Sequence, residues 1–407
     1  MDAYCNRHVN IFDTTLRDGE QAPGYSLTLD QKVEIAGLSE SLGVNTIEVG
    51  FPNSSPTDFE AARQISAFLT RATPCVFARA TEEDIKSGAK ATEKATRRQI
   101  QIATLGSDVH IQYKRNMTRQ QVLDEAQKAL AMAKAHGFDD ISLAIEDATR
   151  SDFDFLKQLL DVGLQGGATA FAIPDTVGCC LPQEFGRLIG QVRAYVGRDI
   201  RISVHCHNDL GMAVANTLAG IEAGGDEVQV TMGGIGERAG NASIEELVAI
   251  LNYKASILHC THDIIQHRLY AAVTRLAEFV QLDVPPHKPI IGRNAFATEA
   301  GMHQQGVMRC RFTYEFMRAE DFGAESRTVV GRHSGRNILR QRLIQSGVRN
   351  ISPSVLDRLY NQIMAEPHVE RYNDTQLLRQ TYESVVEAPA DAPALIRTRH
   401  RETQLAA

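Results

Sequence analysis

Two histidines separated by one residue end an apolar stretch of the sequence. His205 and His207 follow residues 202–204, and a polar turn at residues 208–211 comes directly after them. Because alternate residues of a strand point to the same side, both imidazoles should face one way and Cys206 the other. Two chance buried histidines would give the same spacing. Their position at the end of a strand favours the other interpretation, in which the two histidines form half of a divalent metal site.

Two other polar segments supply further ligand-type side chains. Residues 13–21 close the first apolar run of the chain, and residues 236–241 close the last one. Asp18 could instead be a plain turn residue, and Asn241 could cap the following helix, a role that Ser243 could fill equally well. Added to the histidines, Asp18 and Asn241 would make a mixed nitrogen and oxygen set. Such a set suits Mn²⁺, Mg²⁺, Co²⁺ or Zn²⁺ with open positions for a substrate.

Several side chains near these segments could carry out chemistry beside such a metal. Arg17 would direct a fixed positive charge at a developing enolate or alkoxide. Glu146, at the end of the fifth apolar run, is a candidate for proton transfer. Thr176 could bind a substrate carboxylate, although its position also suits a simple turn. Glu237 is a further catalytic candidate, although Glu237 and Arg238 could form only a structural ion pair.

Eight apolar runs alternate with amphipathic stretches and must position these residues. The runs are almost continuously apolar, which is typical of parallel strands buried on both faces. They span residues 9–12, 46–51, 74–78, 99–103, 141–145, 170–173, 202–207 and 227–232. Eight units of about 30 residues match the ~250 residues of a (β/α)8 TIM barrel, which carries its active site at the carboxyl ends of its strands. An open doubly wound sheet is the competing fold, but the sequence has no Gly-x-Gly-x-x-Gly turn.

Helix starts and domain limits follow from local signals. Thr28, Thr118 and Ser151 have capping-box spacing, and Ser55 precedes a proline at the first helical position. A proline-rich linker at residues 284–289 follows the barrel pattern. We predict three parts: a catalytic barrel over residues 1–275, a mainly helical accessory region over 276–387 that is not a free-standing domain, and a disordered tail over 388–407.

Composition excludes several classes of function. The net charge of −7 provides no basic surface for a nucleic-acid partner, and no apolar run is long enough for a membrane span. The N-terminus lacks the features of a secretory signal. The seven cysteines are scattered and contain no C-x-x-C pair, as expected of reduced thiols. These features predict a cytoplasmic protein.

The segments 13–21, 205–211 and 236–241 resemble the signatures of the 2-isopropylmalate synthase and homocitrate synthase family. The resemblance extends over residues 8 to 345 and implies a Claisen condensation of acetyl-CoA with an α-keto acid on a metal-bearing barrel. By position it implies these roles: metal ligands Asp18, His205, His207 and Asn241, catalytic residues Arg17 and Glu146, and Thr176 near the keto-acid carboxylate.

A later segment of the chain also resembles this family. Residues 294–297 and 301–306, followed by Tyr314, are similar to the segment that brings a histidine and a tyrosine to the active site of the partner subunit. The resemblance therefore implies a homodimer in which His303 and Tyr314 act as catalytic residues. Members inhibited by leucine carry a further C-terminal domain, and only a short stretch follows residues 331–335 here. We therefore expect no inhibition by leucine.

The identity of the keto acid is open between two branches of the family. Residues 48–52 look more like the 2-isopropylmalate branch, whose substrate is 2-oxoisovalerate, than the homocitrate branch, which uses 2-oxoglutarate; a related alkyl- or aryl-malate synthase is a further alternative. A small apolar pocket would suit 2-oxoisovalerate, whereas 2-oxoglutarate needs a cation for its second carboxylate. Arg79 and His110, both at predicted strand ends, could supply that cation and bind the substrate, or could be structural.

Three other functions remain as alternatives. An acyl-CoA lyase of the same barrel group would not need the segment that carries His303 and Tyr314. A non-catalytic metal-binding protein would not need the complete set of candidate residues. Metal-assisted hydrolysis is chemically possible, but hydrolytic barrels usually carry the His-x-His pair on the first strand, whereas here it is on the seventh.

Overall fold

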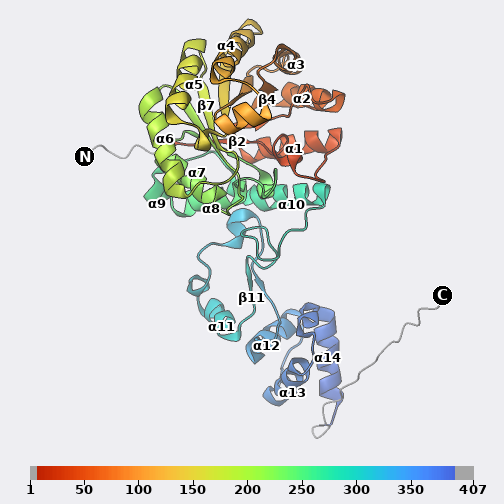
Figure 1. The fold of residues 1–407 in the computed structure, drawn as a ribbon. Coiled ribbons are helices and arrows are strands. Elements are labelled where there is room, and N and C mark those ends of the chain that lie inside the picture. The colour runs from red at the N-terminus through yellow and green to blue at the C-terminus, as the bar shows by residue number, and fades with distance from the viewer. Residues whose placement is uncertain (1–6, 390–407) are drawn as a thin grey trace, which may run out of the picture. The chain divides into compact units, whose positions relative to one another are not determined.

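Eight parallel strands close into a barrel, as predicted (Figure 1). The structure is a computed structural model and describes residues 7–389. Every predicted run forms a strand: β2 (Asn10–Asp13), β3 (Thr46–Glu48), β4 (Thr73–Arg79), β5 (Gln99–Leu105), β6 (Asp140–Glu146), β7 (Ala170–Asp175), β8 (Arg201–Cys206) and β9 (Glu227–Val230). Each strand pairs in parallel with the next, and β9 pairs with β2. This closure rules out the open sheet.

Helices pack around the barrel; the first seven connect successive strands, and the eighth follows β9. They are α1 (Leu29–Leu42), α2 (Pro56–Phe68), α3 (Glu82–Ala91), α4 (Arg119–Ala135), α5 (Phe153–Gly166), α6 (Pro182–Val196), α7 (Ala213–Glu222) and α8 (Ile244–Tyr253). Capping boxes at Thr28 and Thr118 start α1 and α4, and Ser55 caps α2, as predicted. The prediction at Ser151 is wrong by one residue: Asp152 caps α5 by accepting a hydrogen bond from the amide of Phe155.

The first compact unit extends further along the chain than predicted. It runs to Gly292 and also includes Glu320–Ala324. The predicted boundary at residue 275 falls inside α10 (Leu269–Val280), which buries an apolar face in this unit and packs beside α1 and α8. The first unit also contains three short elements: β1 (Arg7–His8), β10 (Cys260–Thr261), which pairs with β1, and α9 (Ala255–Leu258).

The second compact unit contains Arg293–Ala319 and the chain from Glu325 onward. It has α11 (Gly301–Arg309), α12 (Arg336–Gln345), α13 (Pro353–Met364), α14 (Thr375–Glu387) and a two-stranded sheet of β11 (Ala297–Thr298) and β12 (Arg327–Thr328). Its helices enclose a hydrophobic core around Leu339, Leu359 and Tyr372. The accessory region thus has a hydrophobic core of its own, because α12, α13 and α14 bury their apolar faces against one another. The tail predicted at 388–407 lies outside the described residues from 390 onward.

Among residues 7–389, no helix combines the length and the apolar character that crossing a membrane requires.

Candidate active site

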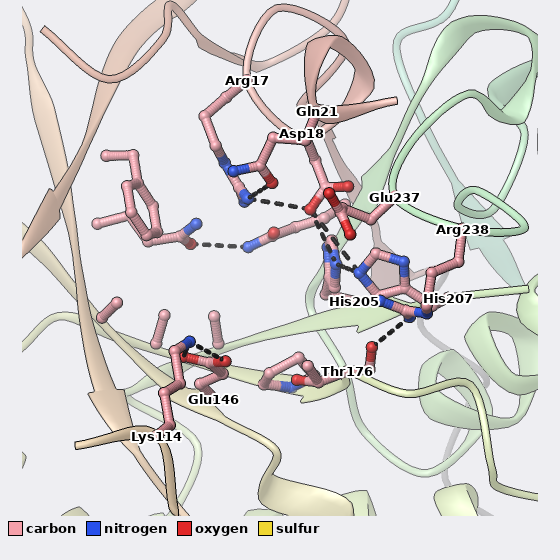
Figure 2. Close-up of a pocket in the computed structure, with 17 residues that line it drawn as sticks. Arg17, Asp18, Gln21, Lys114, Glu146, Thr176, His205, His207, Glu237 and Arg238 are labelled. Atoms are coloured by element: carbon pink, nitrogen blue, oxygen red, sulfur yellow. Dashed lines mark hydrogen bonds and ion pairs between the residues drawn. The ribbon is translucent and has the colours of Figure 1, made fainter. Parts of the chain in front are cut away.

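The two histidines at the end of β8 converge with Asp18, as the sequence predicted (Figure 2). The Nε2 atoms of His205 and His207 lie 3.1 Å apart. Oδ2 of Asp18 lies 3.6 Å from Nε2 of His205 and 3.8 Å from Nε2 of His207. All three side chains are buried, and Cys206 between the histidines is buried as well. Three donor atoms therefore face one point at the carboxyl end of the barrel.

Burial and charge set the protonation of this triad. Burial lowers the pKa of His205 to about 3, and it also lowers the pKa of His207 below its ordinary value. Burial alone would raise the pKa of Asp18, but the positive charge of the adjacent Arg17 lowers that pKa below its usual range. Two neutral imidazoles and one carboxylate are the forms in which these side chains bind a metal ion. The arrangement fits a divalent cation.

Asn241 lies beside the triad, in contact with Asp18. Its Nδ2 donates hydrogen bonds to Oδ1 of Asp18 at 2.8 Å and to the carbonyl of Ile235 at 3.1 Å. Its Oδ1 is buried and has no hydrogen-bond partner among the described residues, as a ligand position would require. Ser243, not Asn241, is the cap residue of α8. Gly236 permits this packing, because a Cβ there would lie 2.1 Å from Nδ2 of Asn241.

Arg17 is held rigidly beside the triad. Its Nη1 lies 2.9 Å from Oδ2 of Asp18, and its Nε lies 2.8 Å from Oε2 of Glu48. The guanidinium also lies over the ring of Phe77, 4.7 Å from its centre. Burial opposes the charge of Arg17, but Glu48 and Asp18 together raise its pKa above the ordinary value. A fixed positive charge therefore lies beside the triad.

A cavity of about 290 Å³ opens in front of the triad. Arg17, Glu146, Thr176 and Glu237 all line it, as predicted for residues of one site. Thr176 accepts a hydrogen bond from the amide of Asp147 at 2.8 Å. Small or apolar side chains form part of the wall: Phe77, Ala103, Ala144, Ala172 and Pro174.

Two ion pairs at this cavity were not among the contacts considered from the sequence. Glu146 makes a close ion pair with Lys114, whose Nζ lies 2.6 Å from Oε1 (Figure 2). Arg238 pairs with Asp209, at 2.8 Å from Nε to Oδ1, and donates to the carbonyl of Thr176. Arg238 therefore forms its ion pair with Asp209 and not with Glu237, which was the structural pair considered from the sequence.

The two predicted cations for a second carboxylate do not line the cavity. Arg79 is directed to Asp84, with Nε 2.8 Å from Oδ2, and its guanidinium lies over Phe51. His110 lies in a π-helical turn, His110–Lys114, with Nδ1 3.1 Å from Oε1 of Glu146. Arg79 therefore pairs with a carboxylate that does not line the cavity, and His110 contacts Glu146, which does line it.

His303 and Tyr314 belong to the second unit. Their rings stack at 4.1 Å between centres, and Tyr314 is 55% exposed. Gly306 allows this contact, since a Cβ there would lie 2.9 Å from the Tyr314 ring. The two side chains are thus in contact with each other.

Sequence reasoning did not assign three polar groups of this site. Glu48 is fully buried, and burial raises its pKa although Arg17 opposes the shift. Gln101 donates to Glu48 at 3.0 Å and accepts from Gln229 at 2.8 Å. A glutamate inside an otherwise apolar run was the available signal for Glu48. Lys114 had no such signal, because it follows β5 in an irregular turn.

Comparisons with known proteins agree with this geometry. The model of the HMGL-like family matches residues 8–275, and the model of the homocitrate synthase post-HMGL domain-like family matches residues 290–368. The chain belongs to the HMGL-like family. A solved hydroxymethylglutaryl-CoA lyase from Pseudomonas aeruginosa has the same barrel, with a TM-score of 0.61, 19% identity, and coverage of 69% of this chain and 96% of that one.

Within the family, the relatives of higher identity are synthases. The 2-isopropylmalate synthase of Methylococcus capsulatus is 41% identical over 388 residues, which cover 94% of this chain and 74% of the relative. The 2-isopropylmalate synthase 1 of Caldanaerobacter subterraneus is 41% identical over 359 residues, covering 88% and 90%. The chain is accordingly a condensing enzyme similar to the 2-isopropylmalate synthases.

Proposed function

We propose that this enzyme condenses acetyl-CoA with 2-oxoisovalerate, and that water then hydrolyses the thioester to give 2-isopropylmalate and free CoA. The names of its relatives support this reaction, and the triad of Asp18, His205 and His207 supports a divalent ion in the site. Asn241, with its buried and unpartnered Oδ1, is the proposed fourth ligand. When bound, such an ion would polarise the keto carbonyl of the substrate.

The residues around the triad have separate roles in this proposal. Arg17 stabilises the oxyanion that forms as the new carbon–carbon bond develops. Thr176 already accepts a hydrogen bond from Asp147 at Oγ1, so its hydroxyl hydrogen is available to the keto-acid carboxylate. Glu146 and Glu237 line the cavity and are the candidates for moving a proton at the acetyl methyl group.

The side chains that line the cavity support 2-oxoisovalerate as the keto acid. The wall of alanines with Phe77 and Pro174 suits a branched alkyl side chain. The three cations that line the cavity are all paired with carboxylates: Arg17 with Asp18 and Glu48, Lys114 with Glu146, and Arg238 with Asp209. A second substrate carboxylate would have to displace one of these pairs, which disfavours 2-oxoglutarate.

We further propose that the enzyme acts as a homodimer in which His303 and Tyr314 reach the active site of the second copy. Large apolar side chains near this pair are exposed to solvent, among them Met302 at 82% and Phe312 at 80%. Exposed apolar groups gathered on one segment are typical of an interaction surface.

Release of free CoA with a panel of α-keto acids tests the reaction. We expect the largest kcat/KM with 2-oxoisovalerate and identification of the product as 2-isopropylmalate by mass spectrometry. A larger kcat/KM with 2-oxoglutarate would refute the proposed substrate but leave the condensation intact. Absence of CoA release with every keto acid in the metal-loaded enzyme would refute the condensation itself.

A further inference from the structure

A π-helical turn contacts the carboxyl end of β6 beside the active-site cavity. It spans His110–Lys114, and the amide of Arg115 donates to the carbonyl of His110, five residues earlier, at 3.2 Å. Such turns are rare in proteins and are frequent at functional sites. The turn follows β5 and places Lys114 among the residues that line the cavity.

Ser107 anchors this turn to the end of β6. Its Oγ accepts a hydrogen bond from the amide of His110 at 3.2 Å and donates to the carboxylate of Asp147, which follows Glu146 directly. Asp147 is fully buried and is held in turn by Arg150, whose Nη2 lies 2.8 Å from Oδ2. The turn is therefore attached firmly to the residue next to Glu146.

Lys114 contacts both carboxylate oxygens of Glu146. Its Nζ donates to Oε1 at 2.6 Å and to Oε2 at 2.8 Å (Figure 2). On the same carboxylate, Nδ1 of His110 lies 3.1 Å from Oε1. Charge-assisted hydrogen bonds of this length are strong, and the carboxylate cannot rotate without losing one of them. Glu146 is thus held in one orientation at the cavity.

The exposure of this ion pair favours a role in the active site over one in folding. The side chain of Lys114 is 52% exposed, and that of Glu146 is 25% exposed. Ion pairs between partly exposed side chains contribute little to folding stability, because water solvates both charges in either state. Both residues line the cavity, so the effect of the pair falls on the groups that face a substrate.

The other glutamate of the cavity is not held in this way. Glu237 lines the cavity and is exposed, and its carboxylate has no hydrogen bond or ion pair within residues 7–389. Of the two carboxylates considered for moving a proton, only that of Glu146 has a fixed direction. Fixed direction matters because proton transfer requires the reacting atoms to be aligned.

We propose that Lys114 is a positioning residue that orients Glu146 as the base for the methyl group of acetyl-CoA. This inference rests on the proposed condensation and assigns the base to Glu146 rather than to Glu237. A carboxylate oxygen of Glu146 accepts a proton from the methyl carbon, and the electron pair of that C–H bond forms the enolate that attacks the keto carbon of the second substrate. Lys114 acts through Glu146 and does not touch the reacting atoms.

A double-mutant cycle on the full, metal-loaded chain tests the proposal, with folding checked by circular dichroism. Glu146→Gln should lower kcat by about 10²–10⁴-fold, the usual contribution of a general base. Lys114→Met removes the charge and should lower kcat by about 10- to 100-fold, since a shift of ~1 Å in a reacting group can cost about 10²-fold. In the Glu146→Gln background, Lys114→Met should have no further effect, because Lys114 acts through Glu146.

Lys114→Arg retains the charge and should keep more of kcat than Lys114→Met does. Arg115→Met is the matched control and should leave kcat unchanged, because Arg115 does not line the cavity and its Nη2 lies 2.8 Å from Oε1 of Glu125. Equal losses from Lys114→Met with and without Glu146, or a higher KM for the keto acid with unchanged kcat, would overturn the role of Lys114 alone. Absence of CoA release by the unmodified enzyme would refute the condensation, and this role with it.

Discussion

The guanidinium of Arg17 and the carboxylate of Glu48 meet at 2.8 Å, although they come from different strand ends. Glu48 ends β3, whereas Arg17 follows β2. Thr14 and Gln101 donate further hydrogen bonds to Glu48, so this carboxylate cannot turn away. Arg17 is consequently oriented before any substrate binds, which lowers the cost of reorganisation during the reaction.

Arg17→Ala should reduce kcat by about 10²–10³-fold, the usual effect of removing one donor to an oxyanion. Metal content should remain near normal, because Arg17 is not a ligand. Arg17→Lys should restore little, since a single ammonium cannot contact both Glu48 and Asp18 as the guanidinium does. An increase in KM with unchanged kcat would show that Arg17 only binds the substrate.

His207→Ala should abolish both metal binding and turnover while the barrel stays folded. The imidazole is one of the three side chains of the triad and is not part of the hydrophobic core, so its loss removes only a proposed ligand. Metal content by mass spectrometry and circular dichroism check the two parts. His287→Ala, which removes an exposed histidine from the linker, is the control and should keep full metal content. Turnover by dialysed, metal-free His207→Ala at the unmodified rate would disprove the assignment.

Ala144→Leu should shift substrate preference towards smaller keto acids. Ala144 lines the cavity and is almost fully buried, so a larger side chain must occupy space meant for the substrate. We expect the ratio of kcat/KM for 2-oxoisovalerate to that for pyruvate to fall about 10- to 100-fold, the range for a few methylene groups in an apolar pocket. The ratio is insensitive to any loss of folded enzyme. An unchanged ratio would show that the alkyl side chain of the keto acid does not lie against Ala144.

Mixing two inactive variants tests the proposed homodimer. Arg17→Ala and His303→Ala subunits, unfolded and refolded together, should regain part of the activity. In a mixed dimer, one active site would have both an intact Arg17 and an intact His303 from the other copy. Each variant refolded alone is the control. Full activity of the unmodified protein as a monomer in analytical ultracentrifugation would contradict the prediction.

Glu245 should make the protein less stable as the pH rises from about 4.5 to 7. Burial raises the pKa of Glu245 from 4.5 to about 7, although Lys288 opposes this shift. Between these two pH values, the folded state retains a proton that the unfolded state has lost. The contribution of Glu245 to the free energy of unfolding is therefore greatest below pH 4.5 and falls up to pH 7. The loss is roughly 3 kcal/mol, at about 1.4 kcal/mol per pKa unit.

Glu245→Gln should lack this change, because glutamine does not titrate. The free energy of unfolding, measured by urea titration between pH 5 and pH 8, should fall less in the variant than in the unmodified protein. Other ionisable groups contribute equally to both proteins and cancel in the comparison. Parallel pH profiles would show that Glu245 stays ionised across this range.

Local patterns in the sequence were sufficient to predict the barrel and the convergence of Asp18, His205 and His207. The eight apolar runs read directly as strands, since strands buried on both faces have no polar alternation to obscure them. His205 and His207 were found because residues two apart on a strand share a face. Asp18 and Asn241 were candidates because all carboxyl ends of parallel strands meet at one mouth, and the family resemblance then implied that they are metal ligands. Each of these inferences needed only the order of residues.

Only the tertiary structure decided which charges pair. Arg79 turned to Asp84, Lys114 to Glu146 and Arg238 to Asp209. The last pair joins residues from different β-α units, and the sequence does not state how far each long side chain bends or which carboxylate it meets first. Strand order follows from local pattern, whereas ion pairs depend on distances of a few ångströms that exist only after the barrel has closed.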